Sequence, residues 1–222
     1  MRVLTISAHP DDETLGCGGT MLTHRAAGDE LHWLVITAAH PPQWPADVVE
    51  RKAEEVRQVA SAYGISQTVK LGLPTVRLDT VPLIDVIGRI RDCIADVRPD
   101  VVYLPHDGDV HTDHHVVFQA TMSVLKAFYM RQFGVRAILS YETLSSTEAA
   151  PPHPFRAFIP TVYRDVSSHL DRKIAIMDLY ASERQADPLP RGPSAIRALA
   201  RYRGATAGVE YAEAFMLIRE VI

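Results

Sequence analysis

Close to the amino terminus the chain reads Arg2-Val3-Leu4-Thr5-Ile6-Ser7-Ala8-His9-Pro10-Asp11-Asp12-Glu13. The run from Arg2 to Ala8 is short, apolar and rich in β-branched residues, which predicts a buried strand. Polar and turn-forming residues follow it directly, and helical spacing then extends over 14–27, with Gly28 as the expected end of the helix. A strand that ends in a charged turn and continues into a helix is typical of the βαβ unit of a parallel sheet.

The same alternation of strands and helices continues over the first 140 residues. Further strands are expected at Leu31–Thr37, Thr68–Leu71, Val101–Leu104 and Arg136–Ser140, and further helices at Asp47–Tyr63 and Val81–Val97. Each crossover between parallel strands should be right-handed. The sequence therefore predicts an α/β fold with a mainly parallel, doubly wound sheet.

Beyond residue 140 the pattern is less regular. We expect a short strand at Val162–Val166, helices at Ser167–Arg184 and Ser194–Tyr202, and a final apolar segment at Ala214–Ile218. Proline-rich loops at 150–154 and 187–193 separate these elements. We predict one domain, 1–222, with a core over 1–140 and a small C-terminal cap subregion with further elements over 141–222.

Composition narrows the classes of function. The 222 residues are 47% hydrophobic, which is enough for a full core, and the formal net charge of −4 argues against binding nucleic acid. Cys17 and Cys93 are too few for a disulfide framework, and no signal peptide precedes Leu4. No apolar run approaches the roughly 20 residues of a membrane span. We therefore expect a soluble, cytoplasmic protein that does not bind polyanions.

Two clusters of acidic residues and histidines follow two of the predicted strands. One is His9–Glu13, after the first strand, and the other is His106–His115, after the strand at Val101–Leu104. In open parallel sheets, ligands bind beyond the carboxyl ends of the strands, where the strand order reverses. These two strands are neighbours in the usual doubly wound order, so the two clusters are expected to meet in one crevice.

The residue types in these clusters favour a catalytic metal site. His9 and Asp12, three residues apart at a strand-to-helix turn, can point towards one ion, and a histidine from the second cluster can supply a third ligand. An open position then remains for water. Nitrogen and oxygen donors fit zinc, and iron(II), cobalt or manganese would also be accepted. Asp11 and Asp113 are left for proton transfer and for orienting the ligands.

Each cluster alone also has a simpler interpretation. Asp11 and Asp12 could cap a helix that begins near Glu13, and a single histidine at a helix start is usually a polar surface residue. The run Gly16-Cys17-Gly18-Gly19 lies too far beyond the strand for a dinucleotide-binding fingerprint. It favours close packing of the first helix, with Cys17 as a packed residue rather than a nucleophile.

The two motifs together resemble the paired signature of the LmbE-like, or PIG-L, family of zinc-dependent de-N-acetylases. The matching segments are Ala8-His9-Pro10-Asp11-Asp12-Glu13-Thr14 and His111-Thr112-Asp113-His114, with further similarity at 98–102, 140–142 and 212–215. The resemblance implies a Rossmann-like three-layer fold, a homo-oligomer, and removal of an acetyl group from an N-acetylated amino sugar or its conjugate by metal-activated water. The alternatives are an amidase acting on a sugar-thiol conjugate, another metal-dependent acyl hydrolase, or a metal-binding module without catalysis.

The resemblance also implies the metal ligands. His9, Asp12 and His114 would bind Zn²⁺, or Fe²⁺ or another divalent metal. His115 directly follows the signature histidine, and adjacent residues on a helix point about 100° apart, so only one of the pair can face the metal. His114 is expected to be that residue.

Catalytic roles follow from the same motifs. Asp11 would act as the general base, and a protonated His111 would stabilise the oxyanion. Asp113, two residues past His111, would orient an imidazole and raise its pKa. Asp109 stands where some relatives have a tyrosine, and we expect it to be a partner of a metal ligand rather than a proton donor.

Substrate contacts are expected from two arginines. Arg51, on the second helix, and Arg191, in the loop at 187–193, occupy positions where relatives use an arginine to hold the sugar or a phosphate. A solvated helix position is the alternative for Arg51. Thr75 replaces an aspartate that several relatives carry after the Leu-Gly-Leu-Pro segment, so the sugar contact made there is in doubt.

Overall fold

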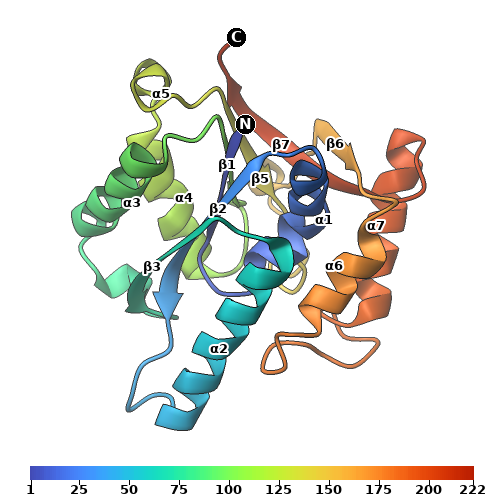
Figure 1. Ribbon diagram of the computed structural model, residues 1–222, viewed down its shortest axis with the longest axis horizontal. Coiled ribbons are helices and arrows are strands. Elements are labelled where there is room, and N and C mark those ends of the chain that lie inside the picture. Colours follow the sequence, from blue (N-terminus) through green and yellow to red (C-terminus); the bar gives the residue numbers. More distant parts are fainter.

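The computed structural model describes all 222 residues and contains one seven-stranded sheet in the order β3-β2-β1-β4-β5-β7-β6 (Figure 1). Its strands are β1 (Arg2–Ser7), β2 (Glu30–Ala38), β3 (Gln67–Pro74), β4 (Val101–Pro105), β5 (Ala137–Tyr141), β6 (Val162–Asp165) and β7 (Ala212–Glu220). The first five strands are parallel, and β7 runs antiparallel to both β5 and β6. The predicted α/β fold with a mainly parallel sheet is confirmed.

Helices cover both faces of the sheet and give the molecule three layers (Figure 1). They are α1 (Asp12–Ala26), α2 (Ala46–Tyr63), α3 (Leu83–Val97), α4 (Thr112–Val124), α5 (Ala127–Phe133), α6 (Leu170–Met177) and α7 (Pro193–Ala207). Short 3₁₀ turns lie at Leu78–Thr80 and Pro154–Arg156. The core of one face contains residues of α1, α2, α6 and α7, and the core of the other contains residues of α3, α4 and α5. None of the helices combines the length and the apolar character that a membrane span requires.

The strand β2 shows why the central strands read as almost continuous apolar runs. Trp33 and Val35 belong to the core beneath α1 and α2, whereas Leu34 and Ile36 belong to the core beneath α3 and α4. Side chains alternate between the two faces of a strand, and here both faces are buried. Hydrophobic residues are therefore needed at every position rather than at every second one.

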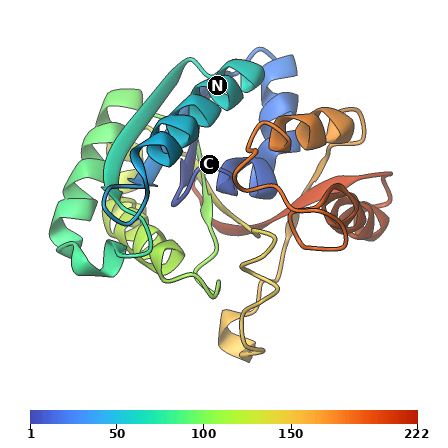
Figure 2. The same ribbon diagram turned by 90° about the horizontal axis from the view of Figure 1, so that it is seen from below.

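The chain beyond residue 140 extends the sheet as well as adding helices. β7 lies between β5 and β6, while α6 and α7 pack on the same face as α1. The helix expected at Ser167–Arg184 is shorter, since α6 spans Leu170–Met177. Figure 2 shows that the segment between β5 and β6, with its 3₁₀ turn, projects from the body of the molecule. The division into a core and a cap subregion stays a prediction.

The helix α1 is kinked at Cys17, whose φ of −141° and ψ of 21° are not helical. Lys173 of α6 donates a hydrogen bond of 2.8 Å to the Leu15 carbonyl on one side of the kink. Glu213 of β7 accepts hydrogen bonds of 2.8 and 2.7 Å from the amides of residues 19 and 20 on the other side. The two buried side chains also form an ion pair at 2.7 Å. They therefore satisfy backbone groups that the kink leaves without helical partners.

Glycines allow α1 to approach its neighbours closely. A Cβ atom on Gly16 would lie 2.1 Å from the ring of Tyr141. That ring is held in place, because its hydroxyl donates a hydrogen bond of 2.8 Å to the Ile6 carbonyl. Cys17 is fully buried beside these glycines. The prediction that this run serves packing is confirmed.

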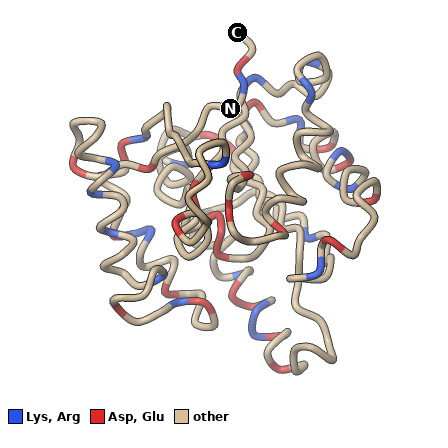
Figure 3. Tube along the Cα trace, turned by 180° about the vertical axis from the view of Figure 1, so that it is seen from behind, with Lys and Arg blue, Asp and Glu red and all other residues tan.

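Charged residues of both signs are distributed over the chain. Figure 3 shows basic and acidic positions mixed along the helices and loops. This mixture agrees with the small formal net charge of −4.

Candidate metal and catalytic site

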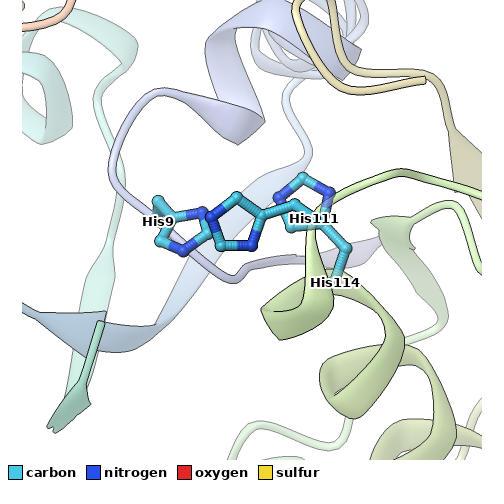
Figure 4. Close-up of side chains that lie close together, drawn as sticks. All are labelled: His9, His111 and His114. Carbon is cyan, nitrogen blue, oxygen red and sulfur yellow. The ribbon is translucent and has the colours of Figure 1, made fainter. Parts of the chain in front are cut away.

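The two predicted clusters meet at one edge of the sheet. β1 and β4 are adjacent, with Val3 paired to Val101, and the strand order reverses between them. The turn after β1 and the loop after β4 therefore emerge side by side, as the sequence predicted. His9, His111 and His114 lie together at this edge (Figure 4), and the ring centroid of His9 is 4.3 Å from that of His111 and 5.4 Å from that of His114.

Three imidazoles and one carboxylate are the possible metal ligands at this edge of the sheet. One nitrogen from each of the three imidazoles falls within 4.8 Å of the other two. The Asp12 carboxylate adjoins them, with Oδ1 at 3.2 Å from Nε2 of His114 and Oδ2 at 3.6 Å from Nδ1 of His9. A set of imidazoles with a carboxylate and no thiolate suits zinc or another divalent transition metal.

Carboxylates hold the outer nitrogens of two of these rings. Nε2 of His9 donates to Asp113 at 2.9 Å, and Nδ1 of His114 donates to Asp109 at 2.6 Å. In the neutral form, each ring then has an unprotonated nitrogen on the side that faces Asp12. Both rings are thus oriented as metal ligands usually are.

His111 has the opposite arrangement. Its Nδ1 accepts a hydrogen bond of 3.2 Å from the backbone N–H of Asp113, so the neutral ring carries its proton on Nε2. Burial, with the nearby rings of His9 and His114, lowers the pKa of His111 to about 4. This shift favours a neutral ring over the protonated one expected from the sequence, and the role of His111 in the reaction stays a prediction. The ring is neutral near pH 7 and offers one N–H group.

Asp113 contacts an imidazole, as expected, but the ring is that of His9 rather than that of the nearby His111. Asp113 lies in the first turn of α4, and its carboxylate points away from His111 towards His9 and the backbone amides of Val76 and Leu78, which donate at 2.8 and 3.2 Å. Only its backbone contacts His111. Asp113 therefore orients His9, and not His111.

His115 and Asp109 fall where the sequence placed them relative to the cluster. Nε2 of His115 forms a hydrogen bond with the backbone carbonyl of Asp109, so this ring takes no part in the cluster. His114 is almost fully buried and is the ring of the pair that faces Asp12. Asp109 acts through His114, as its position suggested.

Asp12 and His114 form a buried ion pair. Burial by itself would raise the pKa of Asp12 and lower that of His114. The attraction between the two groups outweighs the effect of burial. Asp12 also accepts a hydrogen bond from the His9 amide, and its pKa lies below its usual range. His114 also donates to Asp109, and its pKa rises to about 10. A cation held by His9, Asp12 and His114 would take the place of the proton on Nε2 of His114 and would pair with the Asp12 carboxylate instead.

Asp11 occupies a strained turn. Its φ of 118° lies in a region that residues other than glycine rarely adopt, and such strain is often found at functional sites. The fully buried carboxylate of Glu13 holds this turn in place. It accepts hydrogen bonds from the Asp11 amide at 3.2 Å, the Thr14 hydroxyl at 2.6 Å and the Tyr180 hydroxyl at 2.7 Å. Sequence reasoning did not assign Glu13 or Tyr180. For Glu13, its position inside the first motif could have indicated a role in the site.

The Asp11 carboxylate faces Arg191. Nη1 of Arg191 lies 3.0 Å from Asp11 and 2.7 Å from Glu183. Burial raises the pKa of Asp11 well above its ordinary value, and the charges of Asp12 and Glu183 add to this effect, whereas Arg191 opposes it. A carboxylate with a raised pKa is a stronger base than an exposed aspartate.

The cluster opens into a cavity of about 770 Å³. Arg191 lines this cavity, and so does Thr75. Arg51 does not: it is exposed on α2, and the adjacent Lys52 lines the cavity instead. This position favours the alternative of a solvated helix residue, and a substrate contact by Arg51 stays a prediction. Neighbouring helix positions point about 100° apart, so a shift of one residue moves the side chain out of the site.

Comparison with known proteins agrees with this geometry. Residues 4–125, which contain both motifs, match the family model PIG-L, described as GlcNAc-PI de-N-acetylase. The deacetylase YaiS of Escherichia coli K12 is 31% identical over 169 residues, which cover 74% of this chain and 81% of YaiS. The diacetylchitobiose deacetylase of Thermococcus kodakarensis is 24% identical over 234 residues, covering 98% of this chain and 83% of that protein.

A solved structure supports the fold over the whole chain. The conserved protein TT1542 from Thermus thermophilus superposes with a TM-score of 0.74 and 26% identity, covering 99% of this chain and 96% of that one. The family match spans more than half of the chain and includes His9, Asp12, His111 and His114. The chain therefore belongs to the PIG-L family of de-N-acetylases.

Proposed function

We propose that this protein hydrolyses the acetamide of an N-acetylated amino sugar or its conjugate, and that it depends on a divalent cation, for which zinc fits best. His9, Asp12 and His114 would hold the ion. The observation that carries this proposal is a largely buried ligand set whose two imidazoles are each oriented by an outer carboxylate, at 2.9 Å and 2.6 Å. Family membership supports deacetylation as the reaction.

A bound cation of this kind supplies Lewis acidity, which polarises an amide carbonyl and makes water acidic enough to lose a proton near neutral pH. Asp11 lies next to the ligand Asp12 and accepts that proton. His111 donates its Nε2–H to the carbonyl oxygen as negative charge develops there. Because His111 is neutral, this donor does not repel the cation.

Other residues keep this arrangement in place. Arg191 holds the Asp11 carboxylate at 3.0 Å, and Glu13 holds the backbone amide of Asp11. Once Asp11 has taken the proton from water, its carboxyl group can return a proton to the departing amine. The reaction would then release acetate and a free amino sugar in equal amounts.

The experiment measures acetate and amine released from N-acetylglucosamine and from diacetylchitobiose. We expect equal amounts of both products, loss of activity after chelation, and recovery when zinc or iron(II) is added back. An Asp11→Asn variant should retain its metal and lose turnover. Activity that survives chelation, or that persists in the metal-loaded Asp11→Asn variant, would contradict the proposed chemistry.

A panel of other acyl substrates accompanies this assay. Turnover of sugar-thiol amides or of esters, with no release of acetate from N-acetyl sugars, would point to a different acyl hydrolase built on the same site. A cytoplasmic location and a homo-oligomeric state stay predictions from the sequence.

A further inference from the structure

The cavity extends from the histidine cluster along the ends of the strands in two directions. β2 and β3 lie on one side of the cluster and β5 lies on the other, because the cluster sits where β1 meets β4. Beyond β5 the lining is polar and consists of Thr143, Ser145 and Ser146. The volume of about 770 Å³ falls within the range of pockets that hold drug-sized ligands, so one sugar ring does not need all of it.

The side towards β2 and α2 is mostly apolar, with Thr37 and Lys52 as its polar members. Its apolar part is formed by Val35, Trp44, Val49 and Val56, which we call the apolar wall. Val35 and Val56 are buried, whereas Trp44 and Val49 are partly exposed and face the cavity. The small residues Ala38, Ala39 and Ala53 line the same side. A ligand group that covers this wall removes apolar surface from water, which favours binding.

Two of the three lysine and arginine side chains that line the cavity are already paired with carboxylates. Lys52 is paired with Glu183, and Arg191 is paired with both Glu183 and Asp11. An anionic group on the substrate could bind Lys52 or Arg191 only by displacing Glu183. The charge of Glu183 would then lose a partner. Lys70 is the one lining cation outside an ion pair, and it is exposed on the edge strand β3, where a single pair adds little affinity.

We propose that the apolar wall binds an uncharged, apolar aglycone carried by the amino sugar, such as an aryl group, and that sugars carrying a phosphate bind less well. The inference rests on the proposed function, since a sugar ring bound beside His9 and Asp11 places its aglycone along the strand ends. Trp44 and Val49 are the residues that determine this specificity.

The test uses ligands that contain no amide, so that binding is measured without turnover. Phenyl glucoside, methyl glucoside and glucose 1-phosphate are titrated into the purified protein by calorimetry. We expect phenyl glucoside to bind about tenfold more tightly than methyl glucoside, and glucose 1-phosphate to bind no more tightly than methyl glucoside. Equal affinity for the phenyl and methyl glycosides, or tighter binding of the phosphate, would overturn the proposal.

Two adjacent valines of α2 give a matched pair of variants. Val49 lines the cavity, whereas Val48 is also partly exposed but does not line it. Val49→Asp should abolish the preference for the phenyl group, and Val48→Asp should keep it. If both variants behave alike, the phenyl group binds elsewhere and the proposal is wrong. Trp44→Ala provides a second route to the same loss.

Failure of this inference is distinguishable from failure of the proposed function. Acetate release from phenyl N-acetylglucosaminide is followed in parallel with the binding measurement. Selective binding of phenyl glucoside without acetate release would support the apolar wall and contradict deacetylation. Acetate release at equal rates from phenyl and methyl N-acetylglucosaminides would support deacetylation and contradict the apolar wall.

Discussion

The carboxylate of Asp113 lies 2.9 Å from Nε2 of His9, although 104 positions separate the two residues in sequence. The same carboxylate accepts hydrogen bonds from the amides of Val76 and Leu78. One side chain on α4 thus fixes the turn after β1 and the segment after β3. The direction of the His9 ring is therefore set by contacts among three separate parts of the chain.

Replacing Asp113 should weaken metal binding. Asp113→Asn removes the negative charge that orients His9, and loss of such a partner typically lowers metal affinity by about 10–100-fold. Competition with a chelator of known affinity measures the change. Asp107, in the loop between β4 and α4, is exposed, so Asp107→Asn serves as the control and should bind metal as the wild type does. Equal losses in both variants would contradict the role of Asp113.

Replacing His111 should separate catalysis from metal binding. If its Nε2–H contacts the developing oxyanion, His111→Ala should lower kcat by about 10²–10³-fold, as removal of one such donor usually does. Metal content and KM should change little. The measurement combines steady-state kinetics with metal analysis of the purified variant. Loss of the metal would instead identify His111 as a ligand, which its position in the cluster also permits.

The ion pair at the kink of α1 should contribute strongly to stability. Lys173→Met leaves Glu213 buried without its partner, and loss of one member of a buried pair costs about 3–5 kcal/mol. Urea unfolding, with its slope checked for two-state behaviour, gives the free energy. Arg197 and Asp171 form an exposed pair at 2.6 Å, and Arg197→Met should change stability by about 1 kcal/mol at most. Similar effects at the two sites would argue against this account of the kink.

Two glycines should respond to alanine in opposite directions. Gly16→Ala places a methyl group against the fixed ring of Tyr141 and should destabilise the protein by about 1–3 kcal/mol. Gly88 lies inside α3, and a Cβ atom at this position would have no neighbour within 4 Å, so Gly88→Ala should stabilise the protein by about 0.5–1 kcal/mol. Thermal and urea unfolding of both variants measure the difference. A stable Gly16→Ala variant would show that α1 can move away from β5.

The location of the site could be predicted because it depends on local patterns. Apolar runs mark the ends of β1 and β4, polar motifs follow each run, and parallel strand order brings the two ends together. α4 was harder to recognise, because Val116, Val117, Thr121 and Val124 are β-branched, a type of residue with a lower helix propensity. Packing against the sheet, and not local preference, makes this segment helical.

The orientations of side chains could not be predicted from spacing. Asp113 is two residues from His111 in sequence, yet its carboxylate contacts the ring of His9. The first turn of α4 directs this carboxylate towards the segment that follows β3. The hydrogen bonds that Lys173 and Glu213 form with the backbone of α1 join residues that are 158 and 194 positions apart in sequence, and no sequence motif predicts them. Such contacts depend on the complete fold.

The position of β7 also has a consequence for the order of folding. β6 pairs only with β7, and β7 lies between β6 and β5. These two strands therefore cannot join the sheet until residues close to the carboxyl end have been synthesised. Until then the edge of β5 is open to other chains, and the second half of α1 lacks the carboxylate of Glu213. Late contacts between distant segments slow folding. The kinked helix α1, which carries Asp12, is therefore among the first segments to be synthesised and among the last to gain all of its stabilising contacts.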